Sequence, residues 1–294
     1  MTRILLQHGT IYDGSGASGF AGSVLIEDDR ITAVNPENPP ADAEIVDCTS
    51  LAIAPGFIDA HSHSDLQVLE DRPEKALQGV TSEVVGNCGF SPYPQVAAHH
   101  RELHEFANGI FCGAEAWGWT NAADYLADAA RQTRYVNVAS LTGHGSLRVA
   151  VAGHRLGPLT AAERDTSEGL LDDALAGGSV GFSTGLMYAP GDSAPSEELV
   201  RLCRIVARRG KVYSTHMRSY TWGLVQAVEE QIKLARAAGC RLQISHFQAA
   251  GARNWPLQAQ ALELVDKARA EGLDVAFDCY PYVAGSTVMT QLLP

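Results

Sequence analysis

From Pro55 onward the chain alternates short apolar runs with longer amphipathic segments. Seven runs have the length and composition of buried strands, namely FIDAHSH, SEVVGNCG, YVNVASLTGHG, SVGFSTGL, KVYSTHMR, RLQISHF and DVAFDCY. Between them lie segments with helical character, namely residues 121–133, 160–178, 196–210, 222–239 and 256–272. In the last four, apolar residues recur every three or four positions and a glycine closes the pattern. Apolar strands alternating with such helices indicate a parallel sheet covered by helices.

The fold class predicted from this alternation is α/β, with a TIM-type (β/α)8 barrel. Only about seven strands are found where the complete barrel has eight, so we expect the barrel to be incomplete. Residues 1–54 differ, because β-rich runs there are broken by glycine and acidic turn residues. We therefore expect a small N-terminal β-rich region at 1–54, a partial β-sandwich, and the barrel at 55–294.

Composition excludes several classes of protein. The formal net charge is −12, from 22 Lys and Arg against 34 Asp and Glu, and no basic cluster is present. A general nucleic-acid partner is therefore not expected, because binding phosphates needs clustered cations. No signal-peptide pattern and no run of about 18 apolar residues is found, so the expectation is a cytoplasmic protein without a membrane partner. The six cysteines lack a CxxC pair and do not indicate a disulfide framework. No feature indicates an oligomeric state.

Polar or reactive residues stand at the carboxyl end of each apolar run. In chain order they are His61 with His63, Cys88, His144, Thr184, His216, His246 and Asp278. Active sites of parallel barrels lie at that face, built from strand ends and the loops that follow them. A random scatter of ten histidines would not give this pattern, which predicts a functional site there.

The motif His61-Ser62-His63 closes the first run. On a strand, residues i and i+2 point to the same face, so both imidazoles are expected in the barrel lumen while Ser62 faces the helices. Two neutral imidazoles on one face can hold a divalent metal ion. HxH alone is a weak signal, and its position after PGFID and before SDL strengthens it.

The segment PGFIDAHSHSD, with single histidines ending the fifth and sixth runs, resembles the amidohydrolase superfamily. Further segments resemble the D-aminoacylase (N-acyl-D-amino-acid deacylase) branch, namely GVTSEVVGNCGFSP, GHGSLR, GFSTGLMYAPG, YSTHMRSY, ISHFQAAG and DCYPYVAGST. They span nearly the whole chain from Pro55. The β-rich N-terminal region also fits, because that branch carries a small β-sandwich beside its barrel.

The resemblance implies a zinc enzyme. It assigns Cys88, His216 and His246 to a tight zinc site, with the Cys88 thiolate in place of the carboxylated lysine of other superfamily members. His61 and His63 would form a second, weaker metal position. Taken singly, Cys88 reads as a buried structural thiol and each histidine as a hydrogen-bonded core residue. Three such residues at strand ends favour the metal.

Other residues are implied in substrate binding. Tyr280 and Ser286 match positions that touch the substrate carboxylate or polarise its carbonyl, and a Tyr280 hydroxyl near the metal could donate to the developing oxyanion. Tyr188 is expected to line the pocket. Gln248 stands where the family commonly has a lysine that binds the carboxylate, which puts substrate preference in doubt. Barrel packing is the alternative for Tyr280, and loop structure is the alternative for His144 and Arg148, the latter also a substrate-binding candidate.

The general base is expected to be missing from the sequence as given. Members of the branch continue beyond the point matching Pro294, and that stretch carries the eighth strand with the aspartate that moves the proton. Asp278 ends the seventh run and is not promoted to that role. Asp59 and Asp65 flank the HxH motif and are expected to orient loop and ligand histidines.

The predicted activity is zinc-dependent hydrolysis of a linear amide, the deacylation of N-acyl-D-amino acids, on a small-molecule substrate. A second interpretation keeps the metal but assigns cyclic amides or dipeptides, as in dihydroorotase- or isoaspartyl-dipeptidase-like relatives. A third treats the chain as a catalytically incomplete fragment, inactive on its own.

Overall fold

The computed structural model describes residues 2–111 and 117–288. The chain divides into two compact units, Met1–Phe57 and Ile58–Pro294. The boundary expected from the sequence followed residue 54. Of the cysteines, Cys112 lies outside the described residues, and none of the five described ones forms a disulfide.

The first unit is a small five-stranded sheet. Strand β1 (Arg3–Ile11) pairs antiparallel with β2 (Phe20–Glu27), which pairs antiparallel with β3 (Arg30–Val34). Strands β4 (Glu44–Asp47) and β5 (Ala52–Ile53) both run parallel to β1. Its buried apolar cluster consists of Ile11, Val24, Cys48 and Ile53. The β-rich region expected at the N-terminus is therefore a sheet of its own.

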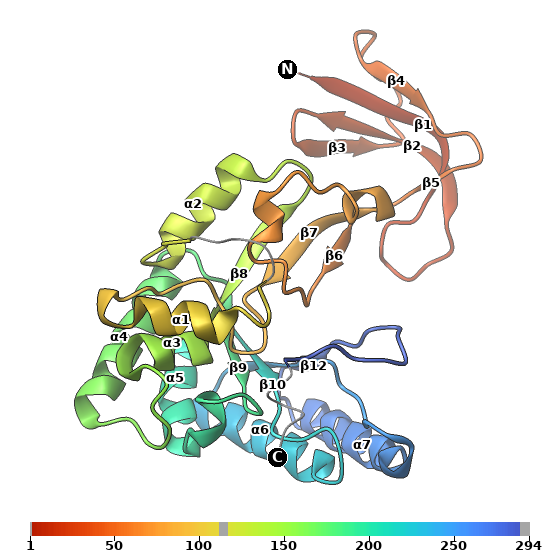
Figure 1. Cartoon of the computed structure of the whole chain (residues 1–294). Helices are drawn as coiled ribbons and strands as arrows, with labels where there is room; N and C mark the ends of the chain where they lie inside the picture. The colour runs from red at the N-terminus through yellow and green to blue at the C-terminus, as the bar shows by residue number, and fades with distance from the viewer. Residues whose placement is uncertain (1, 112–116, 289–294) are drawn as a thin grey trace. The chain divides into compact units, whose positions relative to one another are not determined.

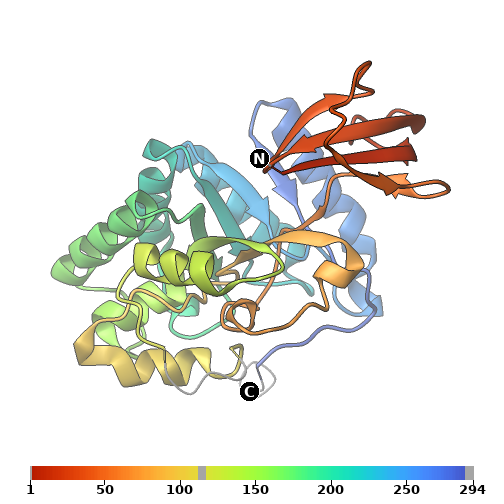
Figure 2. The same cartoon turned by 90° about the horizontal axis from the view of Figure 1, so that it is seen from above.

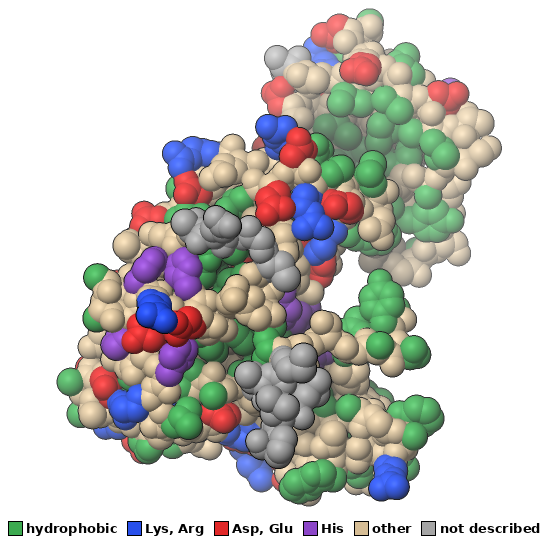
Figure 3. Space-filling model, in the orientation of Figure 1, with side chains coloured by type: hydrophobic (Ala, Val, Ile, Leu, Met, Phe, Trp, Pro, Cys, Tyr) green, Lys and Arg blue, Asp and Glu red, His purple; other side chains and the backbone are tan. Residues whose placement is uncertain are grey.

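This small sheet leaves large apolar side chains exposed, seen in green at the upper right of Figure 3. Those on β3 and β4 are Ile31, Val34, Ile45 and Val46. These side chains lie on the two outer strands, because the sheet order is β3-β2-β1-β4.

The second unit is built on seven parallel strands that form a curled half-barrel (Figures 1 and 2). They lie in chain order, so each strand pairs with the one before it in the sequence. The strands are β6 (Phe57–Asp59), β7 (Val80–Val85), β8 (Asn137–Gly143), β9 (Gly181–Gly185), β10 (Val212–His216), β11 (Arg241–Ile244) and β12 (Val275–Phe277). The predicted incomplete barrel is confirmed.

Helices connect these strands and cover the outer side of the sheet (Figures 1 and 2). They are α1 (His100–Ala107), α2 (Ala122–Gln132), α3 (His144–Ala152), α4 (Ala161–Ala176), α5 (Ser196–Arg208), α6 (Leu224–Ala238) and α7 (Pro256–Ala270). Short 3₁₀ turns occupy Gln67–Leu69, Ala76–Gln78, Ala97–His99, Gly191–Ser193 and Ala252–Asn254. The five helices predicted from periodicity are present as α2 and α4 to α7, whereas α1 and α3 were not predicted.

The main core lies between the sheet and helices α5 to α7. Its buried members include Leu199, Leu202, Val228, Ile244 and Val265. Burying one such side chain contributes about 1.5–3 kcal/mol, so this layer fixes the strands and hence the residues at their carboxyl ends. Among the described residues, no helix is long and apolar enough to cross a membrane.

Candidate metal centre

The carboxyl ends of the strands bring five donor side chains together. His61, His63 and Cys88 form one group, and Cys88, His216 and His246 form a second. Within each group the ligand-type atoms lie within 4.8 Å of one another. Cys88 belongs to both, so its sulfur is the common point of two adjoining donor sets. The sequence pattern thus identified residues that the fold does bring together.

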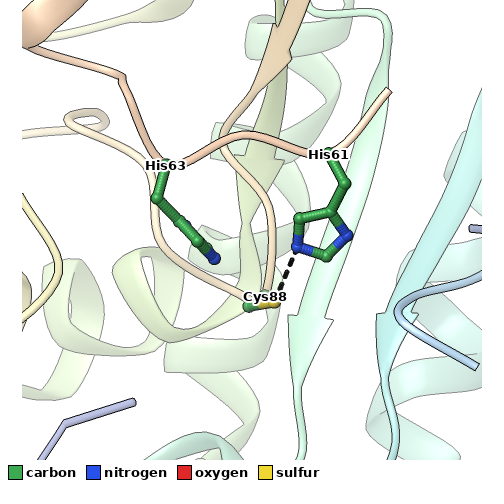
Figure 4. A group of neighbouring side chains, drawn as sticks. All are labelled: His61, His63 and Cys88. Atoms are coloured by element: carbon green, nitrogen blue, oxygen red, sulfur yellow. Dashed lines mark hydrogen bonds between the residues drawn. The ribbon is translucent and has the colours of Figure 1, made fainter. Parts of the chain in front are cut away.

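The HxH motif lies in the loop after β6, not on the strand as predicted, because β6 ends at Asp59. Both imidazoles nevertheless turn toward Cys88, and His61 Nε2 lies 3.3 Å from its sulfur (Figure 4). Ser62 points elsewhere, donating to Glu83 Oε2 at 3.0 Å. The loop therefore points the two imidazoles toward Cys88 and Ser62 toward Glu83, although the motif does not lie on a strand.

Cys88 is held in a tight loop that follows β7. Its φ is 55°, an uncommon value for a residue other than glycine. The loop packs closely on β9, because a Cβ added at Gly185 would lie 2.0 Å from the Cys88 carbonyl oxygen. Glycine is required at position 185 for this approach, and the approach seats the sulfur at the strand ends.

His216 is the last residue of β10, and His246 follows the end of β11. His246 Nε2 lies 3.5 Å from the Cys88 sulfur, and the two imidazole centroids are 4.5 Å apart. Tyr220 packs edge-on against both rings, at 5.0 and 4.8 Å. Its hydroxyl accepts from the Met217 backbone N–H and donates to the Ser245 carbonyl. The sequence reasoning missed Tyr220, because its contacts with the two rings arise from the tertiary fold and leave no signal in the segment YSTHMRSY.

Asp278 was left without a role by the sequence, and the structure places it beside the histidines. Its Oδ1 lies 3.1 Å from His61 Nδ1 and accepts from the His246 backbone N–H at 2.6 Å. Its Oδ2 accepts from Gln243 Nε2 at 3.0 Å. One carboxylate therefore contacts a member of each donor group.

A charged network holds the HxH loop from its other side. Asp59 accepts from the His61 backbone N–H at 3.1 Å and from Lys75 Nζ at 2.8 Å. Lys75 also contacts the buried carboxylate of Glu83. Asp59 thus orients the loop as expected. Asp65 is fully buried, and neither carboxylate oxygen has a partner among the described residues, so its orienting role stays a prediction.

The electrostatics of the cluster favour a thiolate. Burial alone would raise the pKa of Cys88, but the neighbouring His61 and His63 charges and the hydrogen bond with His246 hold that pKa well below its ordinary value. Burial would lower the pKa of His61, yet the Cys88 thiolate and the Asp278 carboxylate raise it to about 10. Burial lowers the pKa of His216. An anionic sulfur surrounded by imidazoles suits a divalent cation.

The donor set fits zinc in two respects, the distances between donor atoms and the presence of ring nitrogens without hydrogen-bond partners. Around tetrahedral zinc, a cysteine sulfur and a histidine nitrogen lie roughly 3.6 Å apart, close to the 3.3 and 3.5 Å separations at Cys88. Both ring nitrogens of His216 are buried without a hydrogen-bond partner in the described chain, as is Nδ1 of His63 and of His246. Unsatisfied buried nitrogens are costly, and coordination to a metal would satisfy one per ring.

The substrate-binding candidates divide by position. Tyr280 lies beside Gln248, whose Nε2 donates to the tyrosine oxygen at 2.7 Å. Tyr188 packs against the His216 ring at 4.7 Å, and its hydroxyl lies 3.2 Å from Thr287 Oγ1. Ser286 is exposed. These residues therefore lie on segments that follow the strand ends, and their roles stay predictions.

Arg148 sits in a different environment, inside helix α3. It is 1% exposed and binds both carboxylate oxygens of Glu198, at 2.8 and 2.7 Å. His144 Nε2 contacts the same carboxylate at 2.9 Å. His144 and Arg148 therefore lie in a helix, and the loop alternative is wrong. The commitment of Arg148 to a buried ion pair supports a structural role, and its substrate-binding role stays a prediction.

A half-barrel with imidazoles and a thiol gathered at the carboxyl ends of its strands defines the class of barrel proteins built around a metal site. The family model described as "Amidohydrolase family" matches residues 44–289. The chain therefore belongs to the amidohydrolase family.

Relatives narrow the likeness further. The chain is 36% identical to a D-aminoacylase and 36% identical to an N-acyl-D-glutamate deacylase, both from Alcaligenes xylosoxydans xylosoxydans, over 98% and 97% of its length. Among solved structures, it matches the N-acyl-D-glutamate deacylase of Bordetella bronchiseptica complexed with zinc and a phosphonate inhibitor, with a TM-score of 0.85, 36% identity and 95% of the chain covered. A D-aminoacylase crystal structure matches with the same TM-score over 96% of the chain.

The chain spans about three fifths of the length of these relatives, covering 59% and 58% of the two Alcaligenes proteins and 58% and 59% of the two solved chains.

Proposed function

We propose that the protein hydrolyses the amide bond of N-acyl-D-amino acids with the help of zinc. The observation that carries this proposal is the convergence of His61, His63, His216 and His246 on the sulfur of Cys88. Three relatives that are 35–36% identical to this chain are named D-aminoacylase, N-acyl-D-glutamate deacylase and N-acyl-D-aspartate deacylase, which supports the choice of substrate class.

In this proposal Cys88, His216 and His246 hold the tight zinc, and His61 and His63 hold a second, weaker ion. Cys88 belongs to both donor groups, which supports a refinement of the prediction in which its sulfur contributes to both positions. Bound zinc supplies Lewis-acid polarisation of the amide carbonyl and acidifies a water molecule.

Tyr280 is proposed to donate a hydrogen bond to the oxyanion that develops during hydrolysis. Because Gln248 Nε2 donates to the tyrosine oxygen, that contact does not use the phenolic proton. The proton stays free to point at substrate, and the bond from Gln248 fixes where the oxygen lies. In this proposal Gln248 binds Tyr280, and it offers no positive charge to a substrate carboxylate.

Hydrolysis also requires a positioned base that takes a proton from water and passes it to the leaving amine. Polarisation of the carbonyl alone does not protonate the nitrogen. Asp278 is bound to His61, His246 and Gln243 through its carboxylate. An acceptor occupied in this way is not free to shuttle protons. An aspartate beyond Pro294 therefore remains the proposed base.

The test is the replacement of Cys88 or His246 by alanine in the full-length protein. Each change should remove bound zinc and turnover of N-acetyl-D-amino acids together, because each removes a donor that cannot be replaced locally. Zinc content by elemental analysis and amine release are the two measurements. Cys48→Ala, which removes a buried thiol in the small unit, is the matched control and should keep both.

Full zinc content and full turnover in Cys88→Ala would contradict the assignment. The substrate is tested separately with a panel of N-acetyl-D-amino acids, their L-enantiomers, cyclic ureides and isoaspartyl dipeptides. Faster turnover of the cyclic or dipeptide compounds would support the second interpretation of the sequence and overturn the deacylase proposal.

A further inference from the structure

The carboxylate of Asp278 joins three segments that are far apart in the sequence. Its Oδ1 lies 3.1 Å from Nδ1 of His61, which is 217 residues away, and accepts from the His246 backbone N–H at 2.6 Å. Its Oδ2 accepts from Gln243. The side chain is only 15% exposed, so solvent competes little for these bonds.

The backbone of Asp278 also grips the turn that carries His246. The Asp278 N–H donates to the Ile244 carbonyl at 3.0 Å, and the Phe247 N–H donates to the Asp278 carbonyl at 2.8 Å. His246 sits in this turn with a φ of 36°, which a residue other than glycine adopts only when its surroundings impose it. The side-chain and backbone bonds of Asp278 supply that constraint.

On the other side, Asp278 sets the orientation of the His61 ring. A hydrogen bond from Nδ1 to a carboxylate fixes which ring nitrogen carries the proton and leaves Nε2 for a metal. Nε2 of His61 is the atom that faces the Cys88 sulfur at 3.3 Å. His61 belongs to one donor group and His246 to the other, yet the same oxygen of Asp278 holds both.

We propose that Asp278 is a positioning residue that aligns His61 and His246 and so fixes the two metal positions relative to each other. This inference rests on the zinc part of the proposed function. It assigns Asp278 no part in the bond-making steps, and its effect is exerted through the ligands it holds.

The experiment compares Asp278→Ala and Asp278→Asn in the full-length protein with the control Asp274→Ala. Asp274 is exposed and directly precedes β12, as Asp278 directly follows it, so the control makes the same chemical change at the other end of the strand. Metal-stripped protein is titrated with zinc alone against a competing chelator, and the melting temperature of the metal-free form is measured in parallel.

We expect zinc affinity at the His61–His63 position to fall by about 10- to 100-fold in Asp278→Ala, the usual effect of removing a hydrogen-bond partner of a ligand. The loss at the His216–His246 position should be smaller, because those rings keep their places at the strand ends. Asp278→Asn retains one acceptor oxygen and should recover part of the lost affinity. Asp274→Ala should titrate as the unmodified protein does.

Unchanged affinity at the His61–His63 position in both variants would overturn the inference. Equal losses at the two positions in Asp278→Ala that track a lower melting temperature, with no loss in Asp278→Asn, would also overturn it by showing a role in folding alone. An unmodified protein that binds no zinc would instead overturn the proposed function.

Discussion

Imidazoles lie on two sides of Cys88, and the position of Cys88 depends on neighbouring residues that no sequence motif includes. Gly185 leaves room for its carbonyl, and the positive φ of Cys88 turns the sulfur toward the histidines. A lone cysteine is more often a buried structural thiol. Here the charge of the neighbouring histidines lowers its pKa, which distinguishes this thiol from Cys203, whose pKa burial raises well above the ordinary value.

Replacing Tyr280 with phenylalanine should lower kcat by about 100-fold and leave KM little changed, because the lost hydrogen bond acts on the oxyanion of the transition state. Steady-state kinetics on an N-acetyl-D-amino acid measures both constants. Tyr282→Phe is the matched control, since Tyr282 is 74% exposed two residues away. A kcat for Tyr280→Phe within twofold of the unmodified protein would show that Tyr280 serves packing instead.

The donor residues of the site could be predicted from the sequence because each stands where an apolar run ends. Asp278 stands in the same place but was given no function, because its partner His61 is 217 residues away and no local pattern encodes that contact. Tyr220 likewise contacts His216 and His246 only through the tertiary fold. Local sequence thus identified the donor residues but not the residues that contact them.

At the scale of elements, the alternation of strands and helices was predictable from periodicity, whereas α1 and α3 were not. Residues 144–150 of α3 are all buried, so the helix lacks the polar face that gives a helical sequence its repeat. The same burial explains why the motif GHGSLR reads as a loop. Its His144 and Arg148 in fact enclose Glu198 of helix α5.

Replacing Glu198 with glutamine should destabilise the protein by about 3 kcal/mol or more, because it leaves the buried guanidinium of Arg148 without a countercharge. Thermal or urea unfolding measures the change. Glu197→Gln is the control, since Glu197 is the exposed neighbour in the same first turn of α5. Equal stabilities for the two variants would show that the buried triad contributes nothing.

The buried contacts of Glu198 with His144 and Arg148 also predict that the stability of the protein depends on pH. Burial would raise the pKa of Glu198, but His144 and Arg148 lower it below its ordinary value. The carboxylate therefore contributes stability that is present above its unfolded pKa of about 4.3 and is lost as the pH falls through the lower folded value. The stability gap between the unmodified protein and Glu198→Gln should persist from pH 8 to 5 and narrow below about pH 4. A gap that stays constant down to pH 3 would contradict this reading.

At the scale of the whole molecule, the half-barrel ends in two edge strands, β6 and β12. Ile58 on β6 is 69% exposed and Phe277 on β12 is 42% exposed. Unpaired strand edges with apolar side chains pair readily with other chains. Nothing in the periodicity of the sequence could show how these edges are covered, because edge pairing is decided by segments that need not lie nearby.

The 294-residue chain expressed alone should therefore self-associate and hydrolyse N-acetyl-D-amino acids weakly or not at all. Light scattering after size exclusion and a turnover assay measure the two properties. Ile58→Lys should reduce the association, because a charge on an edge strand opposes pairing. Leu77→Lys is the control, since Leu77 is 81% exposed and lies in the 3₁₀ turn Ala76–Gln78, not on an edge strand. A monodisperse chain with robust turnover would contradict the prediction.

The strict chain order of the seven strands also governs how the centre can assemble during synthesis. A ribosome delivers β6 and β7 first, so His61, His63 and Cys88 emerge before the partners on β10 and after β11. Each later strand can add to the edge left by the one before, without threading between strands already placed. The group of His61, His63 and Cys88 is therefore complete in the nascent chain before the group that Cys88 forms with His216 and His246, and it is the first place where a metal ion can meet three donors during translation.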